Sequence, residues 1–257
     1  MTHVSEVIIE ERGPARWITL CAPKRRNAYD APMAVAISEA IEDSASVHAV
    51  VITGSQGSFC AGGSLQQLST PTPAQLRALY RASLRMFDAI RQCPRPVIAA
   101  VNGPAAGGGN ELVVACDLAV AGRSATFGQT GPRIGSAPVT GATNVMSLQI
   151  GEKKAKELSI LCRRYSAEQA LAMGLVNEVV DDDQVDQTVQ GWCEEIAALS
   201  PRYLEITKIS SNIWWNAARD NFSTGIGMLM QAVGSDDMVE GATAFLAKRK
   251  PAFPDPS

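Results

Sequence analysis

The chain of 257 residues contains few of the side chains that bind metals or act as a histidine base. Its only two histidines, His3 and His48, lie in no ligand spacing, and its six cysteines include no C-x-x-C pair. We therefore expect no metal site and no catalytic histidine. Because the cysteines stand in apolar contexts, we expect them to be small buried side chains rather than disulfides.

Three further absences concern partners and location. The 23 basic and 26 acidic residues give a net charge of −3 with no Lys/Arg stripe, so we expect no nucleic-acid partner. No apolar run approaches the roughly 20 residues that cross a bilayer, which predicts no membrane association. The first residues lack the basic flank and apolar stretch of a secretion signal, so the expected location is cytoplasmic.

What is present is an alternation of short apolar runs with helical patterns, which predicts an α/β fold with a largely parallel sheet. Asp30 is expected to cap a helix with Pro32 in its first turn, and Ser166 to open a capping box with Gln169. Strands are expected at residues 7–9, 17–20, 49–52, 97–101, 118–120 and 176–180, the first two as a hairpin, and a helix at 74–91.

Strand patterns end near Ser200, which divides the chain into a core at residues 1–199 and a helical region at residues 200–257. The helical region carries more apolar surface than its helices can bury on each other. Such a surface usually becomes a subunit interface. The alternative is an appendage that folds back on the core of its own chain.

Two glycine-rich turns are the most informative features of the sequence. The first, Gly103 to Leu112, follows a strand and begins a helix, so its amides near Gly108 are expected to face a ligand. Glu111 follows one helical turn later, where it would repel a phosphate but can move a proton beside a polarised carbonyl. The second turn, Ser58 to Ser64, offers the amide of Gly63. Two amides from two turns are what an oxyanion hole needs.

Six motifs run in a fixed order through the chain: Lys24-Arg25-Arg26-Asn27-Ala28, Phe59-Cys60-Ala61-Gly62-Gly63, Gly103 to Leu112, Phe127-Gly128-Gln129, Ala170 to Val176 and Lys248-Arg249-Lys250-Pro251-Ala252-Phe253. Together they resemble the crotonase superfamily of enoyl-CoA hydratases and isomerases. The resemblance implies a spiral of ββα units, a C-terminal helical region that forms a homotrimer or homohexamer, and an acyl-coenzyme A substrate without a permanently bound cofactor. It assigns the two oxyanion amides to Gly63 and Gly108, and a catalytic carboxylate to Glu111.

The resemblance also implies a set of substrate-binding residues. Basic side chains near the first and last motifs meet the nucleotide of coenzyme A in this family. The set also contains a residue of the second turn, a tyrosine that either closes over the substrate or packs, and the polar lining of the acyl pocket. The residues assigned to it are Arg25, Arg26, Ala61, Tyr80, Thr130, Gly131, Ser136, Thr140 and Lys250.

One departure from the family pattern concerns the reaction. Hydratases carry a second glutamate in a Gly-Gln-Pro-Glu segment, where this chain has Gly128-Gln129-Thr130-Gly131. The segment Gly135-Ser136-Ala137 resembles hydrolases that open the ring of a cyclic oxo-acyl-CoA. The expected reaction is therefore water addition to an enoyl-CoA or hydrolytic ring opening. The alternatives are ring closure, as in dihydroxynaphthoyl-CoA synthase, and a non-catalytic acyl-CoA-binding scaffold.

Overall fold

The structure is a computed structural model that describes residues 2–4, 6–64 and 72–253. Its main sheet has seven strands in the order β1-β2-β3-β4-β5-β7-β10, antiparallel from β1 to β3 and parallel from β3 onward. The predicted hairpin and parallel sheet are confirmed. The strands are β1 (Thr2–Val4), β2 (Val7–Arg12), β3 (Ala15–Leu20), β4 (Ala49–Gly54), β5 (Val97–Val101), β7 (Leu118–Gly122) and β10 (Glu178–Val180).

A small second sheet lies beside the first glycine-rich turn, where the sequence predicted no strand. It joins β6 (Ala105–Ala106), β8 (Thr126–Gly128) and β9 (Arg164–Ser166), with β6 parallel to β8 and β8 antiparallel to β9. Its two-residue strand β6 is too short to show an apolar alternation in the sequence. The sheet fixes the turn in front of Gly108, because the Gly107 amide donates to the Gly128 carbonyl at 2.9 Å.

The predicted helix caps at Asp30 and Ser166 are confirmed: Asp30 accepts a hydrogen bond of 3.0 Å from the Met33 amide, and Ser166 opens a capping box. Thr72, which the sequence did not indicate, opens a second capping box. Residues 65–71, which precede Thr72, lie outside the described residues. The helices of the core are α1 (Ala31–Glu42), α3 (Pro73–Gln92), α4 (Gly108–Ala115), α5 (Ala142–Ile150), α6 (Glu152–Leu161), α7 (Ala167–Ala172) and α8 (Val185–Ala197), with short 3-10 turns at Pro23–Arg25, Gly131–Ile134 and Asp182–Gln184.

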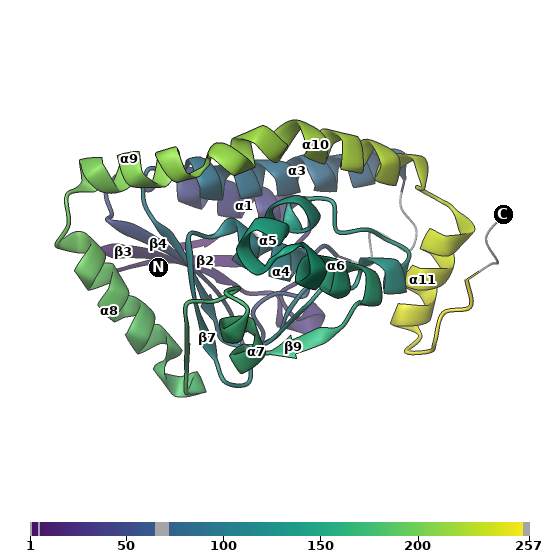
Figure 1. Cartoon of the computed structure of the whole chain (residues 1–257), viewed down its shortest axis with the longest axis horizontal. Coiled ribbons are helices and arrows are strands. Elements are labelled where there is room, and N and C mark those ends of the chain that lie inside the picture. The colour runs from purple at the N-terminus through teal and green to yellow at the C-terminus, as the bar shows by residue number, and fades with distance from the viewer. Residues whose placement is uncertain (1, 5, 65–71, 254–257) are drawn as a thin grey trace.

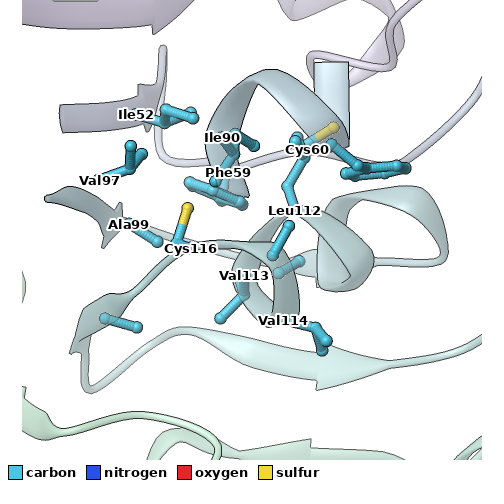
Figure 2. Close-up of a cluster of buried hydrophobic side chains, with 14 of the residues drawn as sticks. Ile52, Phe59, Cys60, Ile90, Val97, Ala99, Leu112, Val113, Val114 and Cys116 are labelled. Carbon is cyan, nitrogen blue, oxygen red and sulfur yellow. The ribbon is translucent and has the colours of Figure 1, made fainter. Parts of the chain in front are cut away.

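Helices cover both faces of the main sheet, so its strands are apolar on both sides. Along β4, Val50 and Ile52 pack with α1, α3 and α4, while Ala49 and Val51 pack with α8. Figure 2 shows the first of these layers around α4, where Leu112 and Val113 lie among side chains from the neighbouring elements. This layer holds α4 and thereby positions the glycine-rich turn at its N-terminus. The predicted burial of the cysteines is confirmed: all six are free, and Cys21 alone is partly exposed.

The C-terminal region forms three helices, α9 (Pro201–Ser211), α10 (Ile213–Gln231) and α11 (Asp236–Leu246). In Figure 1, α10 runs alongside α3. Trp215 and Phe222 of α10 join the main core, with ring centroids 5.1 Å apart. Lys208 of α9 is buried, and its ammonium contacts Asp117 at 2.7 Å and two backbone carbonyls at 2.8 Å. One face of the region therefore folds back on the core.

The opposite face of these helices leaves large apolar side chains exposed. Ile213, Trp214 and Met228 of α10 are 64%, 62% and 69% exposed. Exposed apolar area on this scale is unusual for a surface in contact with water alone. Within the described residues, no helix has the length and apolar character needed to span a membrane.

Candidate active site

The two glycine-rich turns are joined backbone to backbone. The Cys60 amide donates to the Pro104 carbonyl at 3.2 Å, and the Ala106 amide donates to the Cys60 carbonyl at 2.9 Å. Glycines line the contact: a Cβ on Gly109 would lie 2.0 Å from the Cys60 carbonyl oxygen, and one on Gly62 would lie 2.7 Å from the Gly108 nitrogen. No side chain fits between the turns, which explains the glycines at these positions.

The amides of Gly63 and Gly108 have no hydrogen-bond acceptor among the residues that the structure describes. Gly108 begins α4, so its amide is one of the unpaired donors of a helix N-terminus and carries the positive end of the helix dipole. Both residues line one cavity. Both amides are therefore available as hydrogen-bond donors to a ligand in this cavity.

Glu111 is a buried carboxylate beside these amides, with 6% of its surface exposed. Thr140 orients it: the Thr140 hydroxyl donates to Oε2 at 2.7 Å and the Thr140 amide donates to Oε1 at 3.1 Å. Two donors stabilise the ionised form of a buried carboxylate. Thr140 is thus a partner of Glu111 in addition to lining the pocket, a role that the sequence did not predict.

The cavity has a volume of about 810 Å³, which is large enough for an acyl group and the adjoining part of a long ligand. Eleven of the twelve predicted site residues line it, and Lys250 does not. Those eleven are Arg25, Arg26, Ala61, Gly63, Tyr80, Gly108, Glu111, Thr130, Gly131, Ser136 and Thr140. Phe245, Leu246, Lys248 and Arg249 of the C-terminal region also line the cavity, so both parts of the chain build it.

Residues with hydroxyl groups line the cavity near Glu111. Two of them, Tyr29 and Ser83, were not predicted from the sequence. Tyr80 interacts with Ser136, and burial raises the pKa of Tyr80 to about 12. Burial raises the pKa of Tyr29 well above its ordinary value, and the charge of Glu111 raises it further. Both phenols are therefore neutral donors at neutral pH. Tyr29 directly follows a motif recognised in the sequence, but nothing local indicates that its side chain points inward.

Cationic side chains gather at the same cavity. Lys24, Arg164 and Lys248 line it in addition to the predicted Arg26, and no ion pair of these four side chains is found in the described parts of the chain. The predicted Arg25 is engaged by Glu6 and Asp30. Unpaired exposed cations of this kind suit a phosphate-bearing ligand. Within residues 2–4, 6–64 and 72–253, no three His, Cys, Asp or Glu side chains are arranged to hold a metal ion.

Gly131 occupies a place where no side chain fits. A Cβ there would lie 2.9 Å from both the Ser136 carbonyl oxygen and the Ala137 Cα, and 3.0 Å from the Pro138 ring. The Ser136 amide donates to the Gly131 carbonyl at 2.9 Å, which closes this loop tightly. The loop backbone therefore fills the space into which a glutamate at position 131 would project.

Comparison with known proteins identifies the family of the chain. The family model described as enoyl-CoA hydratase/isomerase matches residues 13–256. A carnitinyl-CoA hydratase from Mycobacterium avium is 32% identical, covers 98% of this chain and 99% of its own, and superposes with a TM-score of 0.86. An enoyl-CoA hydratase from Mycobacterium avium subsp. paratuberculosis is 27% identical, with coverage of 98% and 100% and a TM-score of 0.85. One from Bacillus anthracis is 27% identical, with coverage of 97% and 99% and a TM-score of 0.79. The chain belongs to the enoyl-CoA hydratase/isomerase family of the crotonase superfamily.

Proposed function

We propose that the protein is an enzyme that stabilises the enolate of an acyl-coenzyme A thioester. The thioester oxygen accepts hydrogen bonds from the amides of Gly63 and Gly108, and Glu111 moves the proton. One observation carries the proposal. Two amides that have no acceptor among the described residues lie on turns joined by backbone hydrogen bonds, and they line the same cavity as an oriented, buried carboxylate. Donors fixed before the reaction stabilise the developing negative charge without reorganising.

The cations at the cavity support the coenzyme A part of the proposal. Its diphosphate and ribose phosphate are anionic, and the side chains of Lys24, Arg26, Arg164 and Lys248 surround one cavity without ion pairs of their own in the described chain. We assign these four residues to the nucleotide. Lys250 stays a weaker candidate, because it lies outside the cavity lining while the preceding residues are part of it.

Of the two predicted reactions, the site favours hydrolytic opening of a cyclic 3-oxoacyl-CoA. Glu111 takes a proton from water, and the hydroxide oxygen bonds to the ring ketone carbon. The bond from that carbon to the α-carbon then breaks, and its electron pair forms the thioester enolate. Glu111 returns the proton to the α-carbon, which leaves a free carboxylic acid. One carboxylate completes this cycle, in agreement with the closed loop at Gly131.

Hydration of an enoyl-CoA is the second candidate, and the names of the structural neighbours favour it, since they are called enoyl-CoA or carnitinyl-CoA hydratases. In this reaction Glu111 alone would orient the water and deliver the α-proton. Ring closure is disfavoured by Ala137 and Pro138, which stand where the synthases carry an aspartate. A binding scaffold would not need the oriented carboxylate of Glu111.

Product analysis tests these reactions. The purified protein is incubated with crotonyl-CoA and with a cyclic 3-oxoacyl-CoA, and the products are separated and examined for a new free carboxylate. An opened dicarboxyl product supports the hydrolase, and a hydroxyacyl-CoA supports the hydratase. Glu111→Gln should abolish either turnover and still bind coenzyme A. Unchanged turnover in that variant would refute the role of Glu111.

The exposed apolar face of the C-terminal helices supports a homotrimer or homohexamer. The face of α10 that points away from the core of its own chain carries Ile213, Trp214 and Met228. Burial in a subunit interface removes this apolar area from water. Sedimentation should give the mass of a trimer or hexamer, and a monomer at micromolar concentration contradicts the assignment.

A further inference from the structure

Tyr29 contacts both glycine-rich turns. Its amide donates to the Gly62 carbonyl at 2.8 Å, and its carbonyl accepts from the Ser64 amide at 2.9 Å. These two hydrogen bonds form an isolated parallel β-bridge between Tyr29 and Gly63. Its side chain reaches the other turn, where the phenolic oxygen would lie 2.3 Å from a Cβ placed on Gly108. The hydroxyl therefore lies against the Cα of Gly108, beside the amide that begins α4.

The hydroxyl of Tyr29 is nearly buried but belongs to the cavity wall. The Ser83 side chain interacts with this hydroxyl. The Ser83 hydroxyl already donates its one proton to the Leu79 carbonyl at 2.8 Å. The Ser83 oxygen can therefore act towards Tyr29 only as an acceptor. The phenol of Tyr29 thus lies beside a neutral oxygen at the wall of the same cavity.

We propose that Tyr29 is a third hydrogen-bond donor to the thioester oxygen, next to the amides of Gly63 and Gly108. The inference rests on the proposed function. When the enolate forms, its charged oxygen lies beside the phenol and competes with the neutral oxygen of Ser83. A hydrogen bond to a charged acceptor is about twice as strong as one between neutral groups. The bond to the substrate therefore strengthens as charge develops, which is the condition for catalysis.

The phenol donates without giving up its proton. The cavity wall is buried, and the negative charge of Glu111 opposes a second anion at Tyr29. Glu111 stays the group that transfers the proton, and Tyr29 stabilises the oxygen.

The test uses acetoacetyl-CoA, a 3-oxoacyl thioester whose enolate absorbs ultraviolet light differently from the neutral form. The pH midpoint of enolisation is measured for the bound probe in the wild type, in Tyr29→Phe and in Ser83→Ala. Tyr29→Phe removes only the donor, and Ser83→Ala removes only its present acceptor. We expect Tyr29→Phe to reduce the bound enolate about tenfold to a hundredfold at a given pH, the effect of one hydrogen bond to a charged group. Ser83→Ala should preserve or increase it.

The outcomes separate this inference from the proposed function. The role of Tyr29 is overturned if the pH midpoint of enolisation is the same in the wild type and in Tyr29→Phe. It is also overturned if the midpoint rises equally in Tyr29→Phe and in Ser83→Ala. The proposed function stands in both cases. A wild type that neither binds nor enolises the probe overturns both. If Tyr29→Phe does not fold, Ser83→Ala decides alone: a preserved or increased enolate fraction supports the donor, and a reduced one overturns it.

Discussion

Replacement of Thr140 by valine tests how the ionised form of Glu111 is maintained in a buried site. Valine has nearly the shape of threonine but has no hydroxyl, so the variant loses the 2.7 Å bond to Oε2 and keeps the 3.1 Å bond from the backbone amide to Oε1. The ionised carboxylate loses a donor, whereas the protonated form loses little. Thr140→Val therefore shifts the balance towards protonated Glu111.

The magnitude follows from the length and burial of the bond. A hydroxyl that donates to a carboxylate at 2.7 Å, in a residue 5% exposed, belongs to the strong charge-assisted class. Such a bond contributes about 1.5–3 kcal/mol. Since one pH unit corresponds to about 1.4 kcal/mol, the acidic limb of the activity profile should move up by roughly one to two pH units.

The assay is kcat/KM against pH, measured for the wild type, Thr140→Val and Thr140→Ser. The serine variant keeps the hydroxyl and should restore the wild-type limb. The loss of unfolding free energy in Thr140→Val should be largest at neutral pH and should shrink in acid, because the protonated carboxyl accepts a weaker hydrogen bond. An acidic limb that stays in place, or moves to lower pH, would refute the reasoning.

Three further predictions concern the closed loop, the buried ion pair and the cations. Gly131→Glu, which introduces the carboxylate of ordinary hydratases, should lower the Tm and add no hydratase turnover, because its Cβ already meets backbone at 2.9 Å; a gain of hydratase activity contradicts this. Lys208→Met leaves the partly buried Asp117 carboxylate without its cation and should lower the free energy of unfolding in urea by about 3–5 kcal/mol. A decrease below about 1 kcal/mol would show that the ion pair contributes little to stability. Arg26→Gln should weaken coenzyme A binding several-fold in calorimetry, most strongly at low salt. The control is Arg85→Gln, which should not weaken binding because the Arg85 side chain pairs with Glu42 away from the cavity. Equal effects of the two substitutions would remove Arg26 from the site.

The local elements of the fold could be predicted because their causes lie close together in the sequence. Asp30 caps α1 through the amide three residues later, and apolar alternation marks the strands. The glycine-rich turn before Glu111 was recognised in the same way, because a turn and the helix that follows it are set by neighbouring residues. Strand β6 was missed, since two residues carry no pattern.

Only the tertiary structure decided which of these local features meet. The sequence shows two glycine-rich turns, but packing joins them so closely that a Cβ on Gly109 would strike the Cys60 carbonyl. It shows a glycine at 131, but the path of the following loop determines that no carboxylate fits there. Tyr29 reaches Gly108 across 79 positions of the chain, a contact that no local propensity encodes. Short-range preferences therefore determined the elements, and the burial of apolar surface between distant elements determined the site.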